Sequence, residues 1–204
     1  MIPAMTPVEV HNYLRFLGSE WSGQGCAVEL GSWLGATAVP LLEGLVHKGY
    51  DKPFWAFDYW RADHRQVKKA ALQGVQLSIG QDIRAIFTHN VKSVYDDVNT
   101  IQGGVPRTLS QFTEEPIEFC IFDAPKRNPV FIECMQKLEP HFIPGVTVLG
   151  LLDFYSYKKG GEDRKAPVDF ITENPTSFTM IKDWPGICSC AFFKYEKPIS
   201  WKQR

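Results

Sequence analysis

The sequence predicts an α/β protein with a mostly parallel β-sheet, and three observations support this. Five short apolar runs alternate with segments of helical spacing along most of the 204-residue chain. Several of these runs end in an acidic residue or a glycine turn, as strands of a parallel sheet do where ligands bind. The last two runs flank Trp184-Pro-Gly186 and should form an antiparallel hairpin. The length favours one domain over residues 1–204.

Composition narrows the protein class. Hydrophobic residues make up 44% and charged residues 22% of the chain, which is typical of a globular protein. The net charge of -1 gives no support for nucleic acid or an anionic membrane as a partner. The sequence shows no signal peptide and no apolar run long enough for a membrane span. The five cysteines are odd in number and mostly lie in apolar runs, which predicts reduced thiols in a cytoplasmic protein.

The elements follow from these patterns in chain order. Thr6-Pro7 begins a helix with an apolar face, so residues 1–22 are expected to cover the sheet. Predicted strands cover residues 27–30, 53–57, 93–101, 117–122, 146–152, 177–182 and 187–195. Predicted helices cover residues 36–46, one or two segments of 64–92, 129–142 and 167–173. Residues 158–165 are expected to form a solvated loop.

The turn after the first strand indicates the kind of ligand. The run Val28-Glu-Leu-Gly-Ser-Trp-Leu-Gly35 carries glycines at 31 and 35, but Trp33 stands where a dinucleotide-binding turn needs its second glycine. A phosphate-binding P-loop is also unsupported, because the chain contains no Gly-Lys pair. Glu29, near the end of the strand, favours a cationic or hydroxyl-rich ligand over a phosphate. S-adenosylmethionine fits, since it carries a sulfonium and an ammonium and no phosphate.

The end of the second strand supports the same ligand. Asp58 follows this strand, and a carboxylate at that place can accept hydrogen bonds from two ribose hydroxyls. Tyr59 and Trp60 come next and could stack on a purine. The alternative is that Asp58 caps the following helix.

The pattern Glu29-x-Gly31-x-x-x-Gly35, together with Asp58 and the order of strands and helices, resembles the class I S-adenosylmethionine-dependent methyltransferases. This resemblance covers nearly the whole chain. It implies a Rossmann-like seven-stranded, mostly parallel sheet with an antiparallel C-terminal hairpin and helices on both faces. It also implies a set of cofactor-binding residues: Glu29, Gly31, Ser32, Trp33, Gly35, Thr37, Asp58, Tyr59, Trp60 and Asp123.

Within this class the chain resembles small catechol-type O-methyltransferases and the sugar O-methyltransferases of antibiotic biosynthesis. That resemblance implies that Asp123, at the end of the fourth strand, binds a divalent metal and that Lys126 is catalytic. In the catechol type the fifth strand ends in two adjacent metal ligands, whereas here it ends in Asp153-Phe154. Asp123 and Asp153 could hold Mg²⁺, but a third protein ligand is missing unless Asn128 replaces it.

The expected chemistry gives Lys126 two alternative roles. As the base that removes a proton from the acceptor hydroxyl, it needs a lowered pKa, which a nearby metal or sulfonium would cause. Without such a cation, Lys126 would stay protonated beside Asp123 as a structural ion pair. Asp123 and Asp153 could likewise be helix caps or solvated loop residues.

The resulting functional prediction is methyl transfer from S-adenosylmethionine to a hydroxyl of a small molecule, either a sugar or an aromatic compound. Tyr155 and Tyr157 would suit such an acceptor in a loop hinged at Gly160-Gly161. The alternative is a non-catalytic relative that keeps the cofactor site and serves as a partner subunit or sensor. A nicotinamide-dependent reductase is disfavoured by Trp33. The sequence leaves open whether the chain forms a homodimer.

Overall fold

A computed structural model describes residues 2–113 and 115–201 of the chain. Its sheet has seven strands in the order β3-β2-β1-β4-β5-β7-β6, and β7 alone runs in the direction opposite to the other six. The strands are β1 Cys26–Leu30, β2 Phe54–Asp58, β3 Val98–Gln102, β4 Ile117–Phe122, β5 Val148–Leu151, β6 Phe178–Asp183 and β7 Ala191–Tyr195. This confirms the predicted fold class. The strand order reverses between β1 and β4, which is where open α/β sheets bind ligands.

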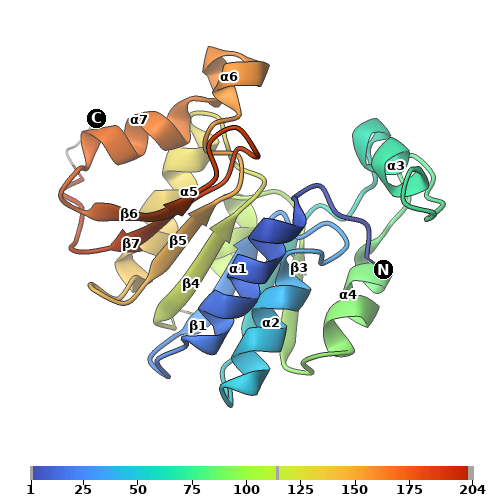
Figure 1. Cartoon of the computed structure of the whole chain (residues 1–204), viewed down its shortest axis with the longest axis horizontal. Coiled ribbons are helices and arrows are strands. Elements are labelled where there is room, and N and C mark those ends of the chain that lie inside the picture. Colours follow the sequence, from blue (N-terminus) through green and yellow to red (C-terminus); the bar gives the residue numbers. More distant parts are fainter. Residues whose placement is uncertain (1, 114, 202–204) are drawn as a thin grey trace.

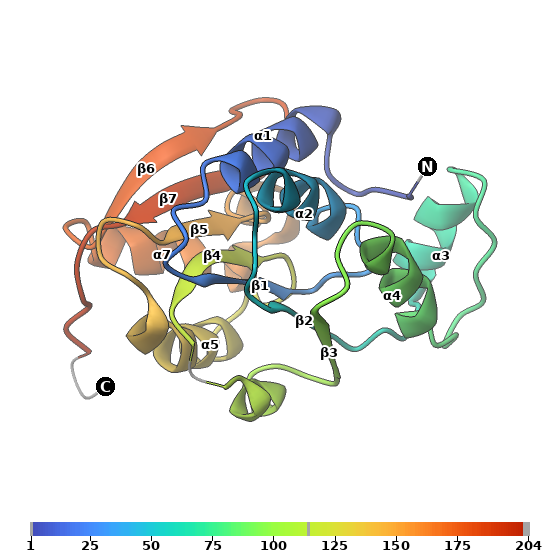
Figure 2. The same cartoon turned by 90° about the horizontal axis from the view of Figure 1, so that it is seen from below.

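Helices cover both faces of the sheet (Figures 1 and 2). On one face lie α1 Val8–Ser19, α2 Ala38–His47 and α4 Arg84–Lys92; on the other lie α5 Val130–Leu138 and α7 Ala166–Glu173. Strands β1 and β4 are buried along their whole length, as their mostly apolar runs favour, and each also buries one glutamate, Glu29 or Glu118. The core is therefore divided by the sheet into two apolar clusters, one containing Leu41 and Phe87 and the other Phe131 and Phe193.

Helix α1 is held very close to α2. Gly44 of α2 faces the backbone of Arg15 in α1, and a Cβ at position 44 would overlap the Arg15 carbonyl oxygen. The segment before α1, Ala4–Pro7, reaches the cavity at the carboxyl edge of the sheet. The predicted covering helix is thus present, although it begins at Val8.

Three element boundaries differ from the sequence prediction. The helix expected over 129–142 ends at Leu138, where Pro140 interrupts the α-helical hydrogen bonds and a 3₁₀ turn, Glu139–His141, follows. Residues 64–92 form two helices, α3 His64–Ala71 and α4, with a non-helical connection between them. The segment 158–165 is not a plain loop: it contains most of the short helix α6 Tyr157–Gly160 and the turn Glu162–Arg164.

The remaining differences are shorter strands. β3 starts at Val98 because Asp96 and Asp97 do not suit a buried strand, and β7 starts at Ala191 because the chain turns after Trp184. A further 3₁₀ turn covers Arg107–Gln111. Within residues 2–113 and 115–201, no helix has the length and apolar character needed to span a bilayer.

Candidate active site

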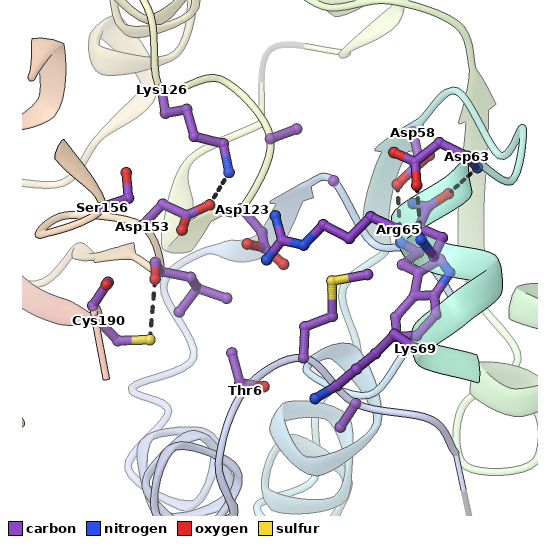
Figure 3. A pocket seen from close by; sticks show the side chains of 18 of the residues that line it. Thr6, Asp58, Asp63, Arg65, Lys69, Asp123, Lys126, Asp153, Ser156 and Cys190 are labelled. Atoms are coloured by element: carbon purple, nitrogen blue, oxygen red, sulfur yellow. Dashed lines mark hydrogen bonds and ion pairs between the residues drawn. The ribbon is translucent and has the colours of Figure 1, made fainter. Parts of the chain in front are cut away.

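A cavity of about 820 Å³ lies at the carboxyl edge of the sheet. Four strand ends contribute to its lining through Gly31 after β1, Asp58 at the end of β2, Asp123 after β4 and Asp153 after β5. Its volume is in the range of small-molecule sites, and it includes the point where the strand order reverses. Figure 3 shows the acidic and basic side chains that meet in it.

The turn after β1 has an unusual backbone. Gly31, Trp33 and Gly35 all have positive φ angles, of 93°, 43° and 90°. A Cβ at Gly31 would lie 2.7 Å from the backbone nitrogen of Ala124, so the β1 turn packs directly on the turn after β4. Left-handed φ is strained for a tryptophan and persists only where the surroundings hold it.

Asp58 is one of the groups that hold Trp33. Its carboxylate accepts the backbone N–H of Trp33 at 2.9 Å and that of Trp60 at 2.6 Å, one on each oxygen. Burial raises the pKa of Asp58, and these backbone N–H groups oppose that shift. Because a carboxylate oxygen can accept two hydrogen bonds, both retain capacity for ligand hydroxyls. Asp58 does not cap the next helix, since Asp63 fills that role with Gln66 in a capping box.

Glu29, a predicted cofactor-binding residue, lies beneath the β1 turn. It is fully buried behind the turn, where the Thr37 hydroxyl donates to its Oε1 at 2.5 Å, and it does not line the cavity. Its Oε2 has no hydrogen-bond partner among the described residues. Burial raises the pKa of Glu29 to about 7, and Thr37 opposes that shift. Glu29 therefore anchors the start of α2 under the turn.

Trp60 is also placed differently from the prediction. Its φ of 44° turns the indole into the core, where the side chain is fully buried against Phe87 and its Nε1 donates to the Trp33 carbonyl at 3.0 Å. It cannot stack on a bound purine. Tyr59 is 66% exposed and lines the cavity, so it remains available for stacking. The other predicted cofactor-binding residues that line the cavity are Gly31, Trp33, Asp58 and Asp123, whereas Ser32, Gly35 and Thr37 do not line it.

Asp123, Lys126 and Asp153 come together on the other side of the cavity. The Lys126 ammonium forms an ion pair with the Asp153 carboxylate, and the two side chains are 21% and 24% exposed. Burial lowers the pKa of Lys126, while the Asp123 carboxylate raises it. The direct contact with Asp153 also favours the ammonium, so Lys126 is protonated in this arrangement. Burial raises the pKa of Asp123 to about 7, although the Lys126 charge opposes the shift.

These donors do not fit a magnesium site. Among the described residues, no three His, Cys, Asp or Glu side chains are grouped so that they could hold a metal ion. Magnesium requires six oxygens, and Asp153 is already neutralised by the Lys126 ammonium. Asn128 is exposed and does not line the cavity, so it supplies no third ligand.

Several lining residues were not predicted. The N-terminal segment Ala4–Pro7 closes one side, and hydrogen bonds of 2.9 and 3.0 Å tie Ala4 to Gln73 after α3. Helix α3 contributes Arg65 and Lys69, and the region after β5 contributes Lys159 and Arg164. The predicted substrate residue Tyr155 does not line the cavity, because its hydroxyl donates to Asp183 at 3.0 Å.

No protein-family model matches the sequence, and no curated protein sequence matches it. Solved structures do match. The O-methyltransferase NovP is 14% identical with a TM-score of 0.70, over 96% of this chain and 83% of that chain. Podospora anserina methyltransferase PaMTH1, solved with S-adenosylhomocysteine, is 11% identical with a TM-score of 0.64. The match covers 95% of this chain and 80% of that chain. CalS11, a TDP-rhamnose 3'-O-methyltransferase of calicheamicin biosynthesis, is 15% identical with a TM-score of 0.55. The match covers 93% of this chain and 80% of that chain.

These neighbours have the architecture that the sequence resemblance implies. At these identities the likeness establishes the fold. The chain therefore has the fold of the class I S-adenosylmethionine-dependent methyltransferases.

Proposed function

We propose that this chain is an S-adenosylmethionine-dependent O-methyltransferase acting on a hydroxyl of a small molecule. The observation that carries the proposal is the cavity at the reversal of strand order. One side of it presents Asp58 and the β1 turn, and the opposite side presents Asp123 beside the Lys126–Asp153 ion pair. A cofactor site and a polar reaction site therefore share one enclosure.

The cofactor side suits a nucleoside with a positive charge. Asp58 would accept hydrogen bonds from the ribose hydroxyls, and the exposed ring of Tyr59 would cover the purine. Gly31 lines this side of the cavity, and its lack of a Cβ lets the β1 turn pack on the turn after β4. When bound, S-adenosylmethionine supplies an electrophilic methyl group on a sulfonium. The Asp123 carboxylate, on the opposite side of the cavity, would stabilise a positive charge near it.

The protein must align an acceptor oxygen and take its proton. We assign proton removal to Asp123, because a pKa of about 7 leaves part of its population ionised at neutral pH and able to receive a proton. Lys126, held as an ammonium by Asp153, would orient the acceptor hydroxyl and stabilise negative charge developing on its oxygen. This replaces the sequence-based expectation that Lys126 is the base.

Binding of S-adenosylhomocysteine, measured by isothermal titration calorimetry, tests the proposal. The wild-type chain should bind it, and Asp58→Asn should weaken binding by about 10- to 100-fold, because a hydrogen bond to a charged group contributes about 1.5–3 kcal/mol. Asp51→Asn is the matched control, since Asp51 is exposed and lies before β2, away from the cavity. Absence of binding, or equal affinity in both variants, would refute the cofactor assignment.

A further inference from the structure

The cavity has a charge balance opposite to that of the whole chain. Six basic and four acidic side chains line it, while the chain as a whole has a net charge of -1. The basic residues are Arg61, Arg65, Lys69, Lys126, Lys159 and Arg164, and the acidic residues are Asp58, Asp63, Asp123 and Asp153. A concave site lined by an excess of one charge attracts ligands of the opposite charge.

Most of the acidic groups are already occupied. Asp58 accepts two backbone N–H groups, Asp63 caps α3, and Asp153 is paired with Lys126. Arg61 is paired outside the cavity with Asp82, at 3.7 Å.

Four cations remain without an ion pair among the described residues: Arg65, Lys69, Lys159 and Arg164. The only lining carboxylate left to face them, within the part of the chain that the structure describes, is Asp123.

The unpaired cations line the cavity from helix α3, from α6 and from the turn Glu162–Arg164. In Figure 3 the Arg65 side chain extends from α3 across the cavity toward Asp123, and Lys69 extends from the same helix toward Thr6. Arg65 and Arg164 both lower the pKa of Lys126, so both guanidinium groups act on its ammonium. Arg164 adds a separate indication, because its Nε is buried without a hydrogen-bond partner in the described residues. A buried donor without a partner is costly and favours a ligand that accepts from it.

We propose that the methyl acceptor carries an anionic group, phosphoryl or carboxylate, that binds between Arg65 and Lys69 on one side and Lys159 and Arg164 on the other. This inference rests on the proposed function and adds a substrate class to it. The guanidinium groups of Arg65 and Arg164 can each donate two parallel hydrogen bonds to such a group. A sulfonium cofactor would add positive charge to an already cationic cavity, and an anionic acceptor would compensate for it.

The test uses two small anions on the full chain, with and without S-adenosylhomocysteine. Inorganic pyrophosphate probes the phosphoryl group and succinate the carboxylate group, each titrated by calorimetry. At least one should bind, and Arg65→Gln and Arg164→Gln should each weaken it by about tenfold or more, as expected for a charged hydrogen bond. Arg84→Gln is the control, because Arg84 is exposed on α4 and does not line the cavity.

The two anions distinguish a phosphoryl from a carboxylate group on the acceptor, because the anion that binds more tightly identifies the group. If neither binds at about 10 mM, a limit that corresponds to less than about 3 kcal/mol of binding free energy, the inference is overturned. Equal affinity in Arg65→Gln, Arg164→Gln and Arg84→Gln would overturn it as well. The titrations without S-adenosylhomocysteine decide the anion site even if the cofactor fails to bind, so failure of the proposed function is seen separately.

Discussion

The Lys126 ammonium pairs with the Asp153 carboxylate across the ends of the neighbouring strands β4 and β5. In this position the lysine neutralises one of the two carboxylates that could otherwise share a divalent cation. Asp123, the other, keeps a pKa near 7 because it is buried with only partial compensation from the lysine. The Lys126–Asp153 pair therefore affects two properties of the site: the pKa of Asp123 and the number of carboxylates free to bind a divalent cation.

We expect divalent metal to be dispensable. Thermal unfolding should give the same midpoint in excess EDTA and in millimolar Mg²⁺, because ligand binding stabilises the native state only where a site exists. S-adenosylhomocysteine affinity should likewise be unchanged. A rise in midpoint that follows Mg²⁺ concentration and is lost in Asp123→Asn would show that the carboxylates do hold a metal.

The stability of the unliganded protein should fall as the pH rises from about 4.5 to about 7. The pKa of Glu29 is raised from 4.5 to about 7 and that of Asp123 from 3.8 to about 7, so in this window the folded state binds more protons than the unfolded state. The shifts are equivalent to at most about 3 kcal/mol for Glu29 and about 4 kcal/mol for Asp123. Urea unfolding at a series of pH values measures how the free energy of unfolding changes with pH.

Glu29→Gln should flatten this pH dependence, because the neutral amide removes one of the two titrations while keeping an acceptor for the Thr37 hydroxyl. Asp51→Asn, at an exposed site, should keep the wild-type slope. A pH profile of Glu29→Gln identical to that of the wild type would mean that the Glu29 pKa is not raised in the folded chain.

The role of Asp123 predicts a pH dependence of catalysis. Once a methyl acceptor is identified, its kcat/KM should rise as the pH passes about 7, where the Asp123 carboxyl loses its proton and can act as a base. Asp123→Asn should abolish that rise and lower the rate by about 10²–10⁴-fold, the usual contribution of a general base. Lys126→Met should lower the rate but keep a rise with pH. If instead Lys126→Met abolishes the rise with pH and Asp123→Asn keeps it, Lys126 is the base.

The packing of α1 on α2 should be sensitive to a single methyl group. Gly44→Ala places a Cβ against the Arg15 carbonyl oxygen and should destabilise the fold by about 1–3 kcal/mol, as overpacking of a close contact does. Val46→Ala, on the same helix but 42% exposed, should change stability by less than about 0.5 kcal/mol. Chemical denaturation compares the two; equal effects would mean that the helices can move apart at little cost.

Much of the fold follows from local sequence patterns. Mostly apolar runs such as 117–122 favour burial on both faces, so the strands and the acids at their ends could be predicted. Asp58, Asp123 and Asp153 reach one cavity because parallel strands bring their carboxyl ends to one edge.

The positions of several site residues depend on backbone conformation and long-range packing, which the sequence pattern does not show. A φ of 44° sends Trp60 into the core, which no residue pattern specifies, and Glu29 is held behind the turn by Thr37. The cavity cations Arg65 and Lys69 lie on a polar helix, α3, whose sequence shows its helical character but not what it faces. The Lys126–Asp153 pair could not be anticipated, because the sequence suggested Asp123 as the partner of the lysine.

A crystal structure of the complex with S-adenosylhomocysteine would locate the cofactor. We expect the ribose hydroxyls against the Asp58 carboxylate, the purine beside Tyr59, and the sulfur on the side of Asp123, with the Lys126–Asp153 pair intact. A ligand bound elsewhere on the sheet, or crystals soaked at saturating concentration in which the cavity at the ends of β1 and β2 holds no ligand, would refute the cofactor assignment.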